Sequence, residues 1–145
     1  MPVNVWKQIQ QHINEKHGFP VIEIGLTAGL NDVQGGLYLN LYGRLSILES
    51  AEVIRRSLMY VGTDSGPAHL ANAVCAYGVT ALGYYHVFRS YTPYSGNYAE
   101  RRNCELVRHG GPVAEIAVER ILTAIDRRMA AVNCCYTGKP HSEAI

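Results

Sequence analysis

Hydrophobic and polar positions along this chain follow helical spacing in some segments and form short apolar runs in others. In residues 5–17, apolar Val5, Ile9 and Ile13 recur every four residues among polar neighbours, and Gly18 ends the run, which predicts a helix with a glycine cap. A longer segment of helical period follows Gly110-Gly111. Helices are expected at residues 5–17, 46–57, 67–77 and 112–129.

Short apolar runs between these helices predict strands, because each is bounded by glycine or polar residues. The expected strands cover residues 19–25, 37–42, 58–62, 79–83 and 104–107, the last of them at a sheet edge. Strands that alternate with helices favour an α/β fold. Residues 26–36 predict a loop at the carboxyl end of the first strand, the edge at which open α/β sheets bind ligands.

Two turns carry clear local signals. Ser46 and Glu49 form the pattern of a capping box, which predicts a helix start, and Arg44 and Leu45 fall in the turn before it. At residues 61–73 an expected strand leads through a polar turn into a helix. There Ser65 is a suitable N-cap, Gly66 allows close approach of a ligand, and Pro67 suits an early helical position. Such a turn predicts an anion site.

Residues 64–73 read Asp64-Ser65-Gly66-Pro67-Ala68-His69-Leu70-Ala71-Asn72-Ala73. This run resembles the donor-site signature of the family 9 glycosyltransferases, the lipopolysaccharide heptosyltransferase group. The flanking elements are similar in order, so that the resemblance covers roughly residues 4–126. It implies a Rossmann-like parallel sheet flanked by helices, which forms one half of a GT-B enzyme and binds a nucleotide-sugar donor such as ADP-heptose.

The resemblance also implies which residues contact the donor, and which cofactors and partners the chain requires. No cofactor and no metal are expected, and the catalytic base is not identified because in this family the catalytic aspartate belongs to the acceptor-binding half. A missing acceptor-binding domain or partner chain is therefore expected, and a homo-oligomer is an alternative. The donor-binding residues implied are Thr63, Asp64, Ser65, Gly66, His69, Arg44, Leu45 and Gly25.

Other interpretations of the same residues stay open. Ser65 could be a helix cap without a ligand, His69 an ordinary surface or core histidine, Arg44 a solvated side chain and Leu45 a core residue. The whole chain could be a non-catalytic nucleotide-binding or regulatory module, or a fragment related to sugar-nucleotide epimerases. A trypsin-like protease, which residues 63–67 superficially resemble, does not fit the alternating pattern, because it needs two β-barrels.

Composition narrows the class of partner. The chain has 145 residues, 48% of them hydrophobic, and a net charge of +1, which gives no electrostatic reason to expect nucleic acid or a membrane surface as a partner. Four cysteines lack C-x-x-C spacing, Cys75 is expected inside a helix, and no signal peptide or membrane span is recognised. A cytoplasmic location is therefore expected.

The carboxyl-terminal half adds two expectations. Half of the ten tyrosines lie in residues 84–98, where they could stack on a sugar, meet another protein or brace a long loop. Residues 1–131 are expected to form a single nucleotide-sugar-binding domain, and residues 132–145 a flexible tail.

Overall fold

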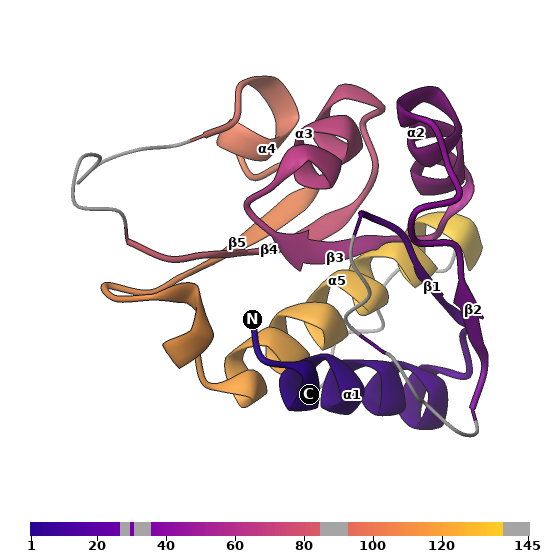
Figure 1. Cartoon of the computed structure of the whole chain (residues 1–145). Helices are drawn as coiled ribbons and strands as arrows, with labels where there is room; N and C mark the ends of the chain where they lie inside the picture. Colours follow the sequence, from indigo (N-terminus) through magenta and orange to yellow (C-terminus); the bar gives the residue numbers. More distant parts are fainter. Residues whose placement is uncertain (27–29, 31–35, 85–92, 138–145) are drawn as a thin grey trace.

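The structure is a computed structural model that describes residues 1–26, 30, 36–84 and 93–137, with side chains described as far as residue 132. Its strands are all parallel to their neighbours and form two sheets (Figure 1). The smaller sheet pairs β1 (Val21–Glu23) with β2 (Tyr38–Asn40). The larger has the order β3-β4-β5, from β3 (Tyr60–Thr63), β4 (Gly78–Leu82) and β5 (Cys104–Arg108).

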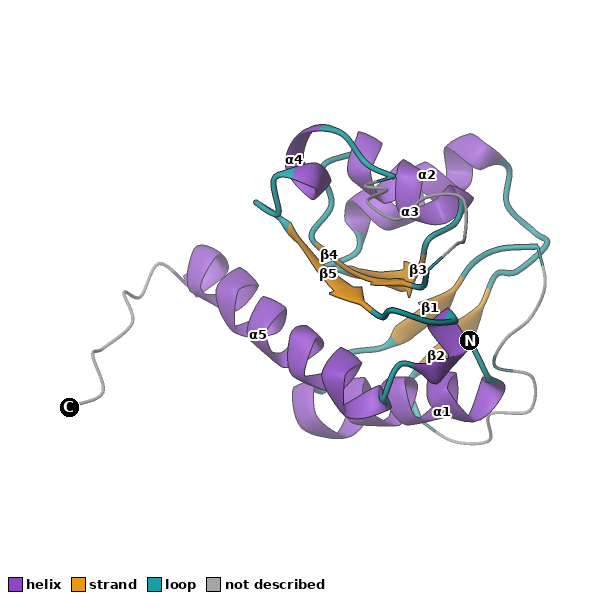
Figure 2. Ribbon diagram, turned by 90° about the vertical axis from the view of Figure 1, so that its left-hand side faces the viewer, coloured by secondary structure: helices purple, strands orange, loops and turns teal. Residues whose placement is uncertain are grey.

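Helices cover both faces of the larger sheet (Figure 2). On one face lie α1 (Val3–His12) and α5 (Val118–Thr137), and on the other lie α2 (Ile47–Arg56), α3 (Gly66–Ala73) and the short α4 (Gly96–Ala99). The central strand β4 is buried along its whole length, as expected for a parallel strand covered on both sides.

Alternate residues of the strands supply two separate hydrophobic clusters. Val79, Ala81 and Val107 pack with α1 and α5, whereas Leu82 and Leu106 pack with α2, α3 and α4. This alternation follows from the two-residue period of a strand, which points successive side chains to opposite faces. The expected α/β architecture is therefore confirmed, although the hydrogen bonds of the described strands form two sheets.

Helix ends differ most from the expectations. The helix expected at residues 67–77 ends at Ala73, because the amides of Cys75 and Ala76 bond back to the carbonyls of Asn72 and Ala71 and close the helix in a Schellman motif. Cys75 therefore lies in the connecting turn, exposed and with a positive φ of 57°, so its predicted place inside a helix was wrong.

The last helix begins later and ends later than expected. A 3-10 turn, η2 (Val113–Glu115), comes first, and extended backbone at Ile116 separates it from α5. Because α5 continues to Thr137, residues 132–137 of the expected tail are helical. Residues 138–145 lie outside the described part of the chain, and the domain boundary at residue 131 stays a prediction.

Two predicted helix caps in the first third of the chain are confirmed. Gly18 has a left-handed φ of 72° after the opening helix, which runs through α1 and then a π-helical turn, η1 (Ile13–His17). Ser46 and Glu49 form both hydrogen bonds of the capping box at the start of α2.

Candidate functional site

The turn between β3 and α3 holds the predicted anion-binding residues. The Asp64 amide donates to the carbonyl of Ala81 at 3.1 Å, so β3 remains bonded to β4 up to the start of the turn. Ser65 is the N-cap residue of α3, as predicted, but its hydroxyl donates to the carbonyl of Thr63 at 3.0 Å and does not cap a helix amide. The residue therefore tightens the turn itself.

At the start of α3, the exposed backbone of Gly66 is the group that can meet a ligand. The amides of Ala68 and His69 donate to the carbonyl of Ser65 at 3.0 and 3.3 Å, and Pro67 has no N–H to offer. Gly66, which begins the helix, is exposed, and a β-carbon added to it would meet no atom within 4 Å. Because helix N-termini carry a partial positive charge, the Gly66 amide and the end of α3 can receive an anion.

Asp64, His69 and Tyr94 form one cluster beside this helix end. The Tyr94 hydroxyl donates to Asp64 Oδ1 at 3.0 Å, and His69 Nε2 lies 3.9 Å from the same oxygen. The His69 and Tyr94 rings are 5.1 Å apart between centroids. The Asp64 side chain is 19% exposed and the His69 side chain 52%, so both can reach a ligand from solvent.

Two buried tyrosines, Tyr94 and Tyr60, contact residues of this turn. Burial raises the pKa of Tyr94, and the neighbouring Asp64 carboxylate raises it further, so Tyr94 keeps its proton as a hydrogen-bond donor. Burial likewise raises the pKa of Tyr60 to about 12, although a hydrogen bond with Ser65 opposes this rise. The ring of Tyr60 passes over Gly62, where a β-carbon would overlap with it.

The other predicted donor residues lie at the ends of the smaller sheet. Gly43 donates its amide to the carbonyl of Gly25 at 2.7 Å, and both glycines have positive φ. Arg44 is exposed and Leu45 half-buried in the turn that follows. In the described part of the chain, the backbone bond between Gly43 and Gly25 thus fixes this group at the smaller sheet, whereas Asp64 of the larger sheet is bonded to Tyr94.

Of the tyrosines in residues 84–98, some are buried in the core and others lie outside the described residues. Tyr94 and Tyr98 are buried and pack edge to face, with ring centroids 5.5 Å apart, so these two brace the core beneath α3. Tyr85 and Tyr91 lie outside the described residues. The contact of Tyr94 with Asp64 was not predicted from sequence, and the only signal for it was the concentration of tyrosines after the fourth expected strand.

A cavity of about 360 Å³ lies elsewhere, between β5 and α5. Its lining includes Glu105 and Arg127, which form an ion pair with each other. Its lining residues belong to β5 and α5, and α5 covers the face of the larger sheet opposite to α3. We therefore place the candidate site at the turn after β3, where the polar groups point to solvent.

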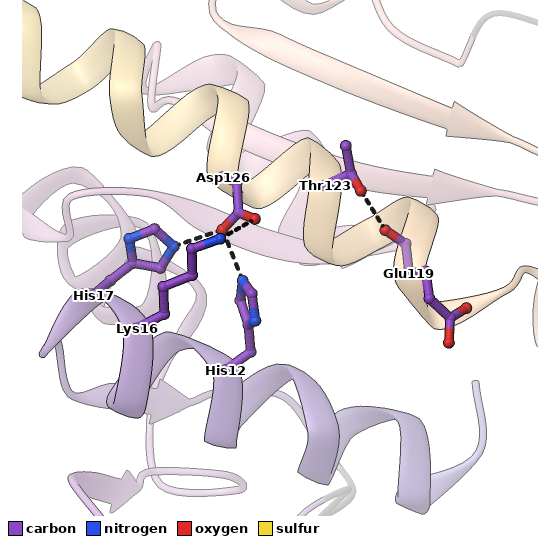
Figure 3. A network of polar contacts seen from close by, with 6 residues as sticks. All are labelled: His12, Lys16, His17, Glu119, Thr123 and Asp126. Carbon is purple, nitrogen blue, oxygen red and sulfur yellow. Dashed lines mark hydrogen bonds and ion pairs between the residues drawn. The ribbon is translucent and has the colours of Figure 1, made fainter.

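A second polar cluster joins the opening helix to α5 (Figure 3). His12, Lys16 and His17 all lie within hydrogen-bond distance of the Asp126 carboxylate. Partial burial opposes ionisation of Asp126, but the hydrogen bonds from Lys16, His12 and His17 outweigh it and hold the pKa of this carboxyl well below its usual range. Spacing along the sequence did not reveal this cluster.

Comparison with known proteins assigns the family. The model of glycosyltransferase family 9 (heptosyltransferase) matches residues 24–109, which include β3, α3 and the turn between them. The chain belongs to glycosyltransferase family 9. This confirms the resemblance noted in the sequence.

A solved family 9 structure has the same fold. The glycosyl transferase family 9 protein from Veillonella parvula DSM 2008 superposes with a TM-score of 0.73 and 14% sequence identity over 90% of this chain. The match covers 42% of that protein, so the present chain spans less than half of its length. No curated protein shows a significant match to the sequence. In the described part of the chain, no helix is long and apolar enough to cross a membrane.

Proposed function

We propose that this family 9 domain binds the nucleotide-sugar donor of an inverting glycosyltransferase at the turn between β3 and α3. The observation that carries the proposal is the arrangement of three groups: the amide end of α3 at Gly66, the exposed imidazole of His69, and the Asp64 carboxylate held by Tyr94. Together they offer positive charge for a diphosphate and an acceptor for a sugar hydroxyl.

Each predicted residue takes a definite part in this proposal. Gly66 and His69 receive the donor diphosphate, whose charge increases as the sugar leaves. Thr63 and Ser65 shape the turn, since the Ser65 hydroxyl bonds the Thr63 carbonyl. Asp64 accepts a hydrogen bond from a ribose hydroxyl through the oxygen that Tyr94 does not occupy.

The smaller sheet supplies the rest of the donor site in this proposal. Arg44 and Leu45 contact the base or the ribose, and the Gly25 backbone fixes the end of β1 beside them. ADP is the nucleotide to test first, because the family description names heptosyltransferases. A cytoplasmic location belongs to the same proposal, and the exposed free thiol of Cys75 favours it.

An acceptor-binding half of a GT-B enzyme is the partner that the chain would need for transfer. Leu26, Ile47 and Leu48 are 91%, 73% and 82% exposed, and they follow the carboxyl ends of β1 and β2. Apolar side chains at a ligand-binding edge suit contact with another protein surface. Since this chain covers 42% of the Veillonella protein, a second domain or chain is a fitting occupant.

The proposal is tested by calorimetric titration of the chain with ADP, GDP and UDP and their sugar conjugates. Asp64→Ala and His69→Ala should weaken binding of the preferred nucleotide by at least about tenfold, which corresponds to one lost charged hydrogen bond. Lys7→Ala, on the exposed surface of α1, is the matched control. If the parent binds none of these nucleotides, or if both site variants bind as tightly as the parent, the assignment is wrong.

A further inference from the structure

His12, His17 and Asp126 bring three metal-binding atoms to one point between the opening helix and α5 (Figure 3). His12 Nε2 and His17 Nε2 lie 2.7 and 2.8 Å from Asp126 Oδ1, and one ligand atom from each residue lies within 4.8 Å of the others. The histidine side chains are 19% and 14% exposed, and Asp126 is 29% exposed. The group is therefore partly shielded from water while an opening remains.

The π-helical turn is what places the two histidines on one face. In an α-helix, residues five apart lie well away from each other around the axis, because one turn takes 3.6 residues. Residues 13–17 form a π-helix, whose wider turn brings His17 back above His12, with ring centroids 5.6 Å apart. Such turns are rare in proteins, and those that occur are often found at functional sites.

We propose that His12, His17 and Asp126 form a binding site for a divalent transition metal ion, with Zn²⁺ as the best-suited ion. Two imidazoles and one carboxylate are ligands that zinc accepts, with bonds of about 2.0–2.2 Å. Tetrahedral bonds of this length place ligand atoms about 3.4 Å apart. The present 2.7 and 2.8 Å separations require each imidazole to withdraw by about 0.6–0.7 Å from the carboxylate.

Proton positions and Lys16 must adjust when the metal binds. Each imidazole must present an unprotonated Nε2, so its remaining proton resides on Nδ1. Lys16 Nζ lies 2.8 Å from Asp126 Oδ2, but its side chain is 56% exposed and can turn into solvent. The ammonium group competes with the metal for the same carboxylate, and its removal should therefore favour the metal.

The metal would have a structural role. Asp126 belongs to α5 and both histidines to the opening helix, so the ion would cross-link two helices on the face of the larger sheet opposite α3. It would raise the free energy of unfolding with the logarithm of the free metal concentration, once that concentration exceeds Kd. It would leave the nucleotide site around Asp64 unchanged.

Calorimetric titration of the full chain with Zn²⁺, after treatment with a chelator, tests the proposal. The expected result is one bound ion per chain and a melting temperature that rises with zinc concentration. Asp126→Asn and His17→Gln should each weaken zinc binding by more than about tenfold. Loss of a residue that only hydrogen-bonds to a metal ligand already costs about 10–100-fold in affinity, and loss of a ligand itself should cost at least as much. Lys16→Met should bind zinc as tightly as the parent or more tightly.

The Lys16 variant separates a metal site from a merely structural cluster. If the four side chains serve only as hydrogen-bonding partners, Lys16→Met and Asp126→Asn should both lower the melting temperature. Added zinc should then leave the melting temperature of the parent and of both variants unchanged. His69→Gln, at an exposed histidine outside the cluster, should leave zinc binding unchanged. Circular dichroism of each metal-free variant confirms that it is folded.

A second measurement does not depend on the variants. Cobalt(II) added to the parent chain should give the absorption of nitrogen and oxygen ligands, with no thiolate band from the cysteines. A thiolate band, the absence of stoichiometric zinc binding, or parent-like binding by both Asp126→Asn and His17→Gln would overturn the proposal.

Discussion

Tyr94 donates its hydroxyl hydrogen to Asp64, a residue 30 positions earlier in the chain, and so orients the carboxylate of the β3–α3 turn. Tyr94 is 6% exposed, whereas Asp64 opens to solvent. A buried aromatic side chain thus fixes the direction of an acidic group that is free to meet a ligand with its second oxygen. The orientation of the candidate site depends on this pair.

Replacement of Tyr94 by phenylalanine should disturb the donor site more than the fold. The ring stays packed on Tyr98 and His69, while Asp64 loses a donor whose bond to a charged group is worth about 1.5–3 kcal/mol when buried. Because water can reach Asp64, we expect a loss of about 1 kcal/mol in the free energy of unfolding. Nucleotide affinity should fall severalfold in calorimetry, and unchanged affinity would show that Asp64 needs no orientation.

Tyr98→Phe is the matched change with the opposite expectation. The Tyr98 hydroxyl is fully buried and has no hydrogen-bond partner among the described residues, so it carries a cost of desolvation without compensation from them. Its removal should leave the free energy of unfolding unchanged or raise it by up to about 1 kcal/mol. Urea denaturation measures this difference. A clear loss of stability would mean that an ordered water satisfies the hydroxyl.

Local sequence signals predicted the elements of this fold better than their ends. The capping box at Ser46, the glycine cap at Gly18 and the order of strands and helices all depend on neighbouring residues, and all are confirmed. The end of α3 depends instead on a left-handed backbone at Cys75, where the amides of Cys75 and Ala76 bond back to the last turn. A helical period alone cannot show this end, because a residue other than glycine rarely signals a left-handed cap.

The candidate site shows the same division. The run from Asp64 to His69 was recognised because strand, turn and helix are contiguous in sequence. The Tyr94 contact and the group of His12, His17 and Asp126 join distant segments. For the histidines, a π-helical turn also changes which residues share a face, and no residue pattern in the segment signals that turn.

Gly66→Ala should separate ligand binding from stability at the start of α3. A β-carbon there meets no atom within 4 Å, and alanine favours a helix over glycine by about 0.5–1 kcal/mol. The free energy of unfolding should therefore stay constant or rise slightly. If the donor diphosphate approaches the Gly66 backbone as proposed, nucleotide affinity should nevertheless fall in calorimetry. Parent-like affinity would contradict that close approach.

Gly62→Ala, in strand β3 just before the turn, should have the reverse effect on stability. Its β-carbon would overlap with the ring of Tyr60, which is buried between the sheet and the helices above it. Overpacking of this kind typically costs about 1–3 kcal/mol. Thermal and urea denaturation should show the loss, and a variant as stable as the parent would mean that the Tyr60 ring can move aside.

Stability above pH 9 should depend on the buried thiol of Cys104. Burial raises the pKa of Cys104 to about 11, although hydrogen bonding with Thr80 opposes the rise. An unfolded chain releases this proton near pH 8.5, whereas the folded chain retains it, so the unfolded state gains stability as the pH rises from about 8.5 towards 11. Below that range the contribution of Cys104 is fully present.

The slope of stability against pH is the quantity to measure. Between pH 9 and 10 a single such group lowers the free energy of unfolding by at most about 1.4 kcal/mol per pH unit. Cys104→Ala should lower stability at pH 7, because it leaves a small cavity, but it should flatten the slope. Cys75→Ser, at an exposed thiol, should keep the slope of the parent. Equal slopes for the parent and Cys104→Ala would show that the thiol ionises in the folded chain as readily as in the unfolded one.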